Sequence, residues 1–128
     1  MKIAIAIVED DPEISGSLFY ILSEHLGKES ISKYSSGEQF ISSLQTKQPD
    51  VVLMDIQLAD ISGIDLIKAL KNNPQTRRIP IIVITAFAMK NEVVRISESG
   101  CDLYLSKPVS IDNFFFSIEK FISNNNIV

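Results

Sequence analysis

The chain has a single cysteine, a single histidine and no apolar run long enough to cross a membrane. Because Cys101 cannot form an internal disulfide, we expect a reducing, cytoplasmic setting. No secretory signal peptide is expected, since the first apolar run, IAIAIV, leads directly into acidic residues. The twelve Lys and Arg are scattered apart from the Arg77-Arg78 pair, and the net charge is −4. The composition therefore argues against both a membrane protein and a direct nucleic-acid binder.

The length of 128 residues and the hydrophobic fraction of 45% predict one compact domain with a substantial core. Internal repeats and low-complexity segments are absent from the sequence. We expect the domain to span residues 1–122. The Asn124-Asn125-Asn126 run is typical of a tail or the start of a linker, which we place at residues 123–128.

Strand-length apolar runs alternate with stretches of helical periodicity along the whole chain. The runs lie at residues 3–8, 30–34, 51–54, 79–84 and 103–105, the second being weaker and half polar. The expected helices begin near Asp11-Pro12, Ser35 or Ser36, Ser62, Met89 and Ser110, and Gly100 is expected to end the fourth. Five βα units in series predict an α/β domain: a five-stranded parallel sheet of order 2-1-3-4-5, with five helices on both faces.

Polar side chains stand where several of these runs end. Glu9 and Asp10 follow the first run, and Asp55 follows the third. Thr85 ends the fourth run and Lys107 comes shortly after the fifth. In open α/β sheets, ligands bind at the carboxyl ends of the strands, in the crevice between strands one and three for this order. The sequence therefore predicts that these residues converge on one edge of the sheet.

Each of these residues, taken alone, could have an ordinary structural role. Glu9 and Asp10 could be solvated loop acids, and Asp55 could be a turn residue. Thr85 could be a plain strand-end hydroxyl, and Lys107 a surface lysine. All of these roles would have to hold together at one predicted edge, so the convergence favours a functional site. The neighbouring Asp11 is expected to be only a helix cap, and we leave it out of the site.

Phosphoryl transfer to a carboxylate would use such a set of groups. Mg²⁺ prefers hard oxygen ligands and binds through one or two carboxylates, waters and phosphate. Asp10 and Asp55 would bind it directly, and Glu9 could hold a metal-bound water. A bound cation offsets the repulsion between the acids and lets a phosphoryl group approach Asp55, with Lys107 and Thr85 contacting that group.

These residues lie in motifs that resemble the receiver domain of two-component response regulators. The motifs are EDD after the first strand, MDIQLADISG around Asp55, ITA after the fourth and YLSKP after the fifth. The resemblance covers about residues 2–122 and implies the flavodoxin-like (βα)5 fold. The ITAFAMK and SGCDLYLSKP stretches are similar in particular to single-domain receivers of the chemotaxis and cell-cycle kind.

The resemblance implies a phosphorylation-dependent switch. Asp55 would accept a phosphoryl group from the phosphohistidine of a sensor histidine kinase or a histidine phosphotransfer protein. Mg²⁺ (or Mn²⁺) would be bound by Glu9, Asp10, Asp55 and the backbone carbonyl of Gln57. Thr85 would move inward on phosphorylation, Tyr104 would rotate behind it, and Lys107 would contact the phosphoryl group. The surface of helix four, strand five and helix five would then bind a downstream protein or a second copy of the chain. Such a domain catalyses only its own phosphorylation and dephosphorylation.

Two positions resemble those that tune the loss of phosphate in this family. They are Gln57 and Phe87, two residues beyond Asp55 and Thr85. We expect the bulk of Phe87 to hinder attacking water and to lengthen the phosphorylated lifetime. Ala59 stands where family members usually carry Pro, so the loop after Asp55 is expected to be less rigid.

Phe116 departs from the amphipathic pattern of the last helix. The other apolar residues share one arc of roughly 120° on a helical wheel, whereas Phe116 points almost opposite, beside Asp112, Glu119 and Lys120. Phe116 is either an isolated exposed apolar residue, which is common, or an anchor for a partner or a second copy. The sequence leaves both interpretations open.

Other classes of protein fit less well. A Mg²⁺-dependent aspartyl-phosphate hydrolase of the haloacid-dehalogenase kind is the main alternative, but it needs a second acid where Gln57 stands, and a cap domain. A flavodoxin-like cofactor binder needs a phosphate-binding loop where Glu9 and Asp10 would repel phosphate. A receiver that has lost phosphorylation would not be expected to retain the acids, Thr85 and Lys107. His25, near the end of the first helix, suits a cation beside the helix dipole better than a phosphohistidine.

Overall fold

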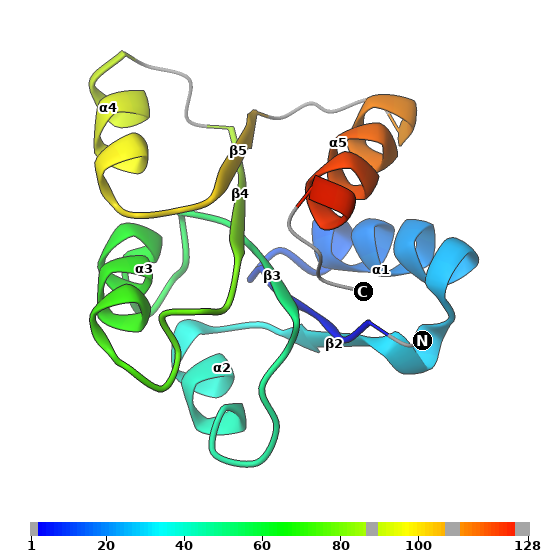
Figure 1. Ribbon diagram of the computed structural model, residues 1–128, viewed down its shortest axis with the longest axis horizontal. Coiled ribbons are helices and arrows are strands. Elements are labelled where there is room, and N and C mark those ends of the chain that lie inside the picture. Colours follow the sequence, from blue (N-terminus) through cyan, green and yellow to red (C-terminus); the bar gives the residue numbers. More distant parts are fainter. Residues whose placement is uncertain (1–2, 87–89, 107–110, 125–128) are drawn as a thin grey trace.

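A computed structural model of the chain describes residues 3–86, 90–106 and 111–124. In these residues, five parallel strands form one sheet in the order β2-β1-β3-β4-β5. Helices cover both faces of the sheet (Figure 1). The predicted fold class and strand order are confirmed.

The strands are short and mostly buried. They are β1 (Ile5–Val8), β2 (Ile31–Tyr34), β3 (Val51–Met54), β4 (Ile81–Thr85) and β5 (Leu103–Ser106). Every residue of β1, β3 and β4 is buried, as expected for central strands covered on both faces. In β2, at the edge of the sheet, Ser32 and Lys33 are exposed, which explains its weaker pattern in the sequence.

Two strands begin later than their apolar runs. The carboxylate of Asp50 accepts a hydrogen bond from the Ala4 N–H at 2.8 Å, so the chain before β1 is held by a side chain. Before β4, the Ile79 N–H donates to the Thr76 carbonyl at 3.0 Å and therefore belongs to a turn. Ile3 and Ile79 are nevertheless buried. A run of apolar residues in the sequence indicates burial, and it does not show which of its residues pair in a sheet.

The helices follow the predicted caps where the structure describes them. They are α1 (Pro12–Leu26), α2 (Gly37–Ser43), α3 (Gly63–Asn72), α4 (Lys90–Glu98) and α5 (Ile111–Asn124), with a 3₁₀ turn at Lys28–Ser30. The Asp11 carboxylate accepts from the Glu13 N–H at 2.9 Å, and the Ser36 hydroxyl accepts from the Gln39 N–H at 3.1 Å. Ser36, not Ser35, is therefore the cap of α2. Gly100 adopts a φ of 101° after α4, as predicted.

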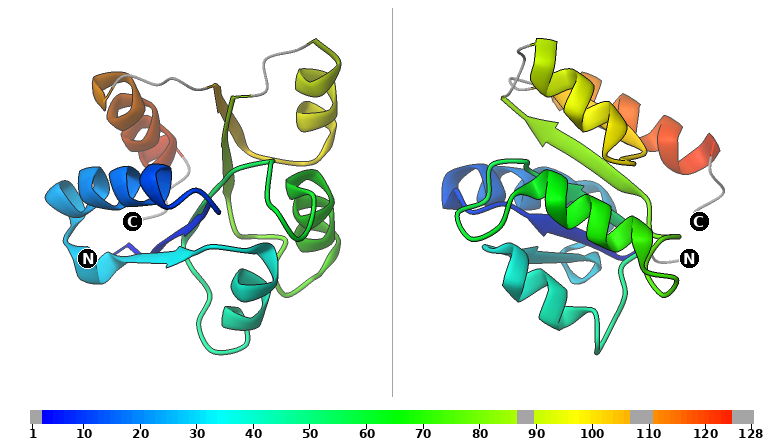
Figure 2. Two further views of the ribbon diagram at one scale, coloured as in Figure 1. Left: turned by 180° about the vertical axis from the view of Figure 1, so that it is seen from behind. Right: turned by 90° about the vertical axis from the view of Figure 1, so that its left-hand side faces the viewer.

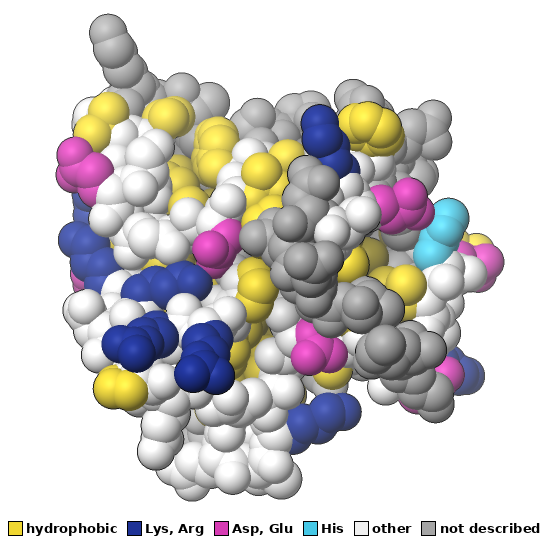
Figure 3. Space-filling view, in the orientation of Figure 1, with side chains coloured by type: hydrophobic (Ala, Val, Ile, Leu, Met, Phe, Trp, Pro, Cys, Tyr) yellow, Lys and Arg dark blue, Asp and Glu magenta, His cyan; other side chains and the backbone are white. Residues whose placement is uncertain are grey.

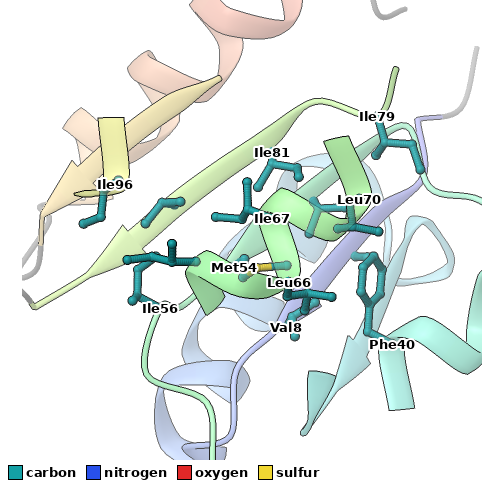
Figure 4. Close-up of a cluster of buried hydrophobic side chains, with 14 residues drawn as sticks. Val8, Phe40, Met54, Ile56, Leu66, Ile67, Leu70, Ile79, Ile81 and Ile96 are labelled. Atoms are coloured by element: carbon teal, nitrogen blue, oxygen red, sulfur yellow. The ribbon is translucent and has the colours of Figure 1, made fainter. Parts of the chain in front are cut away.

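Two apolar cores fill the space between the sheet and its helices. α1 and α5 cover one face, and α2, α3 and α4 cover the other (Figures 1 and 2). On the second face, Phe40, Leu66 and Ile67 pack against Val8 and Met54 of the sheet (Figure 4). On the first face, the core includes Leu22 of α1 and Ile118 of α5. Burial of each such side chain stabilises the fold by roughly 1.5–3 kcal/mol, so the sheet holds the residues at its strand ends in place.

Basic side chains gather on one part of the surface. Figure 3 shows a group of Lys and Arg over α3 and the turn that follows it, a stretch that carries Lys68, Lys71, Arg77 and Arg78. The Lys71 ammonium donates to the Asp102 carboxylate at 2.9 Å and to the Ile79 carbonyl at 3.0 Å. This group lies toward the C-terminal end of α3, whereas the predicted site lies near its N-terminal end. Part of its charge therefore holds α3, β4 and β5 together at the opposite edge of the sheet.

Gly63, the first residue of α3, allows the helix to lie directly against the end of β3. Its N–H donates to the Ile56 carbonyl at 2.9 Å. A Cβ at this position would lie 2.6 Å from the Ile56 Cα and 2.7 Å from the Asp55 carbonyl oxygen. Both neighbours are backbone atoms that cannot rotate away, so the close approach requires glycine.

We predict that Gly63→Ala lowers the free energy of unfolding by about 2 kcal/mol, because the added methyl group must displace backbone. Gly16→Ala, in α1, is the matched control. Apart from its chain neighbours and the backbone of α1 itself, a Cβ there would meet no atom within 4 Å, and the better helix propensity of alanine should stabilise the protein by up to about 1 kcal/mol. Urea unfolding measures both changes. Equal midpoints for the two variants would contradict the packing at Gly63.

Candidate functional site

Two carboxylates lie side by side at the end of the central strands. Val8 of β1 is in register with Met54 of β3, so the next residues, Glu9 and Asp55, occupy neighbouring positions about 4.8 Å apart across the sheet. The Asp55 N–H donates to the Val8 carbonyl at 3.1 Å, which extends the ladder to Asp55 itself. Glu9 is 3% exposed and Asp55 is 7% exposed. The fold thus buries two acids at neighbouring positions of adjoining strands, and buried carboxylates favour positive charge nearby.

The acids after β1 have different surroundings. Asp10 is half-buried and Asp11 is exposed. Asp11 caps α1 through its carboxylate, and its N–H lies 3.3 Å from the Glu9 Oε2. The cap role predicted for Asp11 is confirmed, and its carboxylate is directed at the helix.

The segment after β3 folds back on itself. The Gln57 N–H donates to the Asp55 Oδ1 at 3.1 Å, which fixes the orientation of that carboxylate. The Leu58 and Gly63 N–H groups both donate to the Ile56 carbonyl, at 3.2 and 2.9 Å. The Gln57 side chain is exposed.

Thr85 and Tyr104 lie on the same face of the sheet. Val83 is in register with Met54 on one side and with Tyr104 on the other, and Thr85 is in register with Ser106. Because side chains alternate along a strand, Thr85 and Tyr104 are diagonal neighbours on the face covered by α3 and α4. Thr85 is fully buried, and Tyr104 is half-buried and packs against the core of that face.

Two predicted residues, Lys107 and Phe87, lie outside the described residues. Lys107 directly follows Ser106, the register partner of Thr85. The predicted roles of both residues remain predictions.

The donor set at this edge fits a hard divalent cation in kind. Among the described residues, no three side chains of Asp, Glu, His or Cys lie close enough together to hold a metal ion by themselves. Mg²⁺ does not need one, since it retains waters and binds through one or two carboxylates. Asp10, Asp55 and backbone carbonyls after β3 would supply oxygen ligands of the kind that Mg²⁺ prefers.

Two clefts border this edge. One, of about 410 Å³, is lined by Glu9 and Asp10 together with Lys33 and Gln39 from the β2–α2 side. The other, of about 480 Å³, lies between residues 56–62 and α4, where Glu92 and Arg95 form its far wall. The acidic edge is therefore open to solvent beside β2, and the segment after Asp55 lies next to a hollow on its α4 side.

Asp60 was not predicted from the sequence, although its carboxylate accepts two backbone hydrogen bonds. Its Oδ1 accepts from the Gly37 N–H at 3.0 Å, and its Oδ2 accepts from the Glu38 N–H at 2.9 Å. These two backbone bonds, with Glu38 contributing most, hold the pKa of the Asp60 carboxyl below its usual value of 3.8. The only signal in the sequence was an acid in a loop, and most such acids are simply solvated.

Comparison with known proteins places the chain in a class and then in a family. The model of the "Response regulator receiver domain" matches residues 5–119. The polar-differentiation response regulators DivK of Brucella ovis and Brucella anthropi are 40% and 39% identical to the chain over 124 residues, which is 97% of this chain and 99% of each relative. The chain is a signalling domain of the two-component kind. It belongs to the response regulator receiver domain family.

Solved structures share the fold. The receiver domain of a signal transduction histidine kinase from Syntrophus aciditrophicus is 28% identical, with a TM-score of 0.87 over 95% of this chain and 91% of the other. A two-component response regulator from Clostridium difficile is 25% identical, with a TM-score of 0.86 over 98% and 99%. These likenesses and the family match favour the receiver over the hydrolase. Among the described residues, helices are too short or too polar to span a bilayer.

We predict that ionisation of the Asp60 carboxyl adds to the stability of the fold. Its pKa is lowered in the folded chain, so this contribution is fully present above the unfolded value near 3.8 and is lost as the pH falls through the lower folded value. The difference in urea midpoint between wild type and Asp60→Asn should therefore be constant from pH 7 to about pH 5 and shrink below about pH 4. A difference in urea midpoint that grows as the pH falls would contradict the two hydrogen bonds from α2 to the Asp60 carboxylate.

Proposed function

We propose that the chain is a phosphorylation-dependent switch of a two-component phosphorelay, with Asp55 as the phospho-acceptor. The observation that carries the proposal is the pair of buried carboxylates, Glu9 and Asp55, set side by side by the register of β1 and β3. The family match supports it, because receiver domains interact with histidine kinases and downstream targets. The phosphoryl donor would be a phosphohistidine of a sensor histidine kinase or a histidine phosphotransfer protein.

In the proposed reaction, an Asp55 carboxylate oxygen attacks the phosphorus of the phosphohistidine. The new P–O bond forms as the P–N bond breaks, and the electron pair returns to the imidazole nitrogen. The product is an acyl phosphate on Asp55 and a free histidine on the partner. The Gln57 N–H, 3.1 Å from the Asp55 Oδ1, holds the carboxylate for this attack.

Mg²⁺ or Mn²⁺ would be held by Asp10, Asp55 and the Gln57 backbone carbonyl, with Glu9 positioning a water. When bound, the cation neutralises charge on the acids and on the transferring phosphoryl group. Lys107, which follows β5 in the sequence, would contact the phosphoryl oxygens. Gln57 and Phe87 would tune the rate at which the phosphoryl group is lost to water.

The signal would pass through Thr85 and Tyr104. Their placement on one face of neighbouring strands supports the proposal that a shift of Thr85 toward the phosphoryl group opens space for the Tyr104 ring. The affected surface is formed by α4, β5 and α5 and would bind a downstream protein or form a homodimer. Phosphorylation shifts the equilibrium between the inactive and active conformations only as far as it stabilises one of them more than the other.

We propose residues 1–122 as the receiver domain, 123–128 as a tail or linker start, and a cytoplasmic location.

Incubation with acetyl phosphate tests the acceptor. We expect the wild type to gain one phosphate by mass spectrometry in the presence of Mg²⁺, and to gain none after chelation of the metal. Asp55→Asn should gain none under either condition. Asp11→Asn is the matched control, since Asn caps a helix as well as Asp and Asp11 lies outside the site. An unmodified wild type, or an Asp55→Asn protein that is phosphorylated equally, would overturn the proposal.

Phe116 supports the proposed output surface. It lies in α5 and is 67% exposed, with the Lys120 ammonium 6.0 Å from its ring centroid. A large exposed aromatic residue on this surface is the kind of residue that anchors interfaces.

We expect Phe116→Ser to weaken self-association of the phosphorylated protein or its binding to a downstream partner at least about fivefold, with unfolding stability unchanged. Tyr20→Ser is the control, because Tyr20 is 65% exposed but lies in α1. Analytical ultracentrifugation measures self-association, and titration measures partner binding. If neither responds to Phe116→Ser, the exposed ring has no interface role.

A further inference from the structure

The segment that follows Asp55 is held at its base and at its tip by different means. At the base, the Gln57, Leu58 and Gly63 N–H groups close the chain upon Asp55 and Ile56. At the tip, residues 58–61 have no regular secondary structure. The α4 side offers them little support, because the cleft of about 480 Å³ separates this segment from Glu92 and Arg95.

Support comes from α2 instead. The first N–H groups of a helix have no partners within it. In α2, the Ser36 hydroxyl accepts from the Gln39 N–H, whereas the Gly37 and Glu38 N–H groups donate to the two carboxylate oxygens of Asp60. Asp60 thus completes the cap of a helix 22 and 23 residues earlier in the chain. A fork of two bonds from one carboxylate fixes direction as well as distance.

Packing makes the same connection. A Cβ on Gly37 would overlap the Cγ2 of Ile61 and would lie 3.3 Å from the Leu66 Cδ2. Glycine at the first position of α2 therefore allows Ile61 to lie against the helix. Ile61 is half-buried and packs on the core that also contains Phe40 of α2. Polar and apolar contacts join the same two segments.

We propose that Asp60 is a positioning residue for phosphorylation: by clamping the segment 56–62 to the start of α2, it holds Asp55 and the Gln57 backbone in the geometry that phosphoryl transfer requires. This inference rests on the proposed function. Asp60 acts through the segment and not on the phosphoryl group. A misplacement of about 1 Å at a reacting group can cost up to about a hundredfold in rate, so loosening the clamp should be visible in kinetics.

The test compares Asp60→Ala with Ser36→Ala. Both variants remove cap bonds from α2, but only the first releases the segment after Asp55. With acetyl phosphate and saturating Mg²⁺, Asp60→Ala should be phosphorylated at least about threefold more slowly than wild type. The rate for Ser36→Ala should differ from the wild-type rate by less than about threefold. Asp60→Asn, which keeps one acceptor oxygen, should fall between Asp60→Ala and wild type and serves if Asp60→Ala fails to fold.

Amide hydrogen exchange gives a second readout that does not depend on phosphorylation. The Gln57, Leu58 and Gly63 amides should exchange faster in Asp60→Ala and at the wild-type rate in Ser36→Ala. A rate loss below threefold in Asp60→Ala, or an equal loss in Ser36→Ala, would overturn the proposal. An unphosphorylated wild type would instead refute the proposed function, and the exchange data would still show whether Asp60 holds the segment.

Discussion

The burial of two like charges at one edge of the sheet is the constraint on which the rest of the site depends. Glu9 and Asp55 are brought together by backbone pairing, since Val8 and Met54 are register partners and the Asp55 N–H donates to the Val8 carbonyl. The backbone positions of these two acids cannot separate without breaking the pairing of the central strands. Buried carboxylates at neighbouring positions favour positive charge nearby. The proposed binding of a cation and then of a phosphoryl group rests on that arrangement.

The two-sided core determines how an event at this edge can travel. Thr85 and Tyr104 share the face of α3 and α4, whereas Leu103 and Leu105 pack toward α1 and α5. A displacement at the end of β4 therefore acts first on the α4 side of the sheet. Because protein cores are closely packed, a buried hydroxyl cannot shift without a neighbouring side chain moving as well. Tyr104, half-buried on the edge strand, is the diagonal neighbour of Thr85 on this face.

The sequence alone predicted the fold and the placement of Glu9, Asp55 and Thr85 at the carboxyl ends of adjoining strands, because buried parallel strands are continuous apolar runs and their ends are visible. It predicted strand bounds less well: Ile3 and Ile79 are buried but unpaired in the sheet, and burial is all that an apolar run records. Asp60 could not have been found this way. Its bonds join residues 22 and 23 positions apart, and neither an acid in a loop nor a glycine after Ser36 specifies a partner at that distance.

The contact between Asp60 and α2 also explains why this segment tolerates a hollow beside it. A chain bordered by a cleft on the α4 side would be free to sample several conformations, with an entropic cost to ordering it for each reaction. Two bonds from one carboxylate to a helix that is itself packed through Phe40 remove much of that freedom before the reaction begins. In the proposed switch, the hollow would leave room for α4 to move while the segment after Asp55 stays in place. Rigidity toward α2 and space toward α4 together suit a site that must hold its acceptor still and pass a displacement to one side.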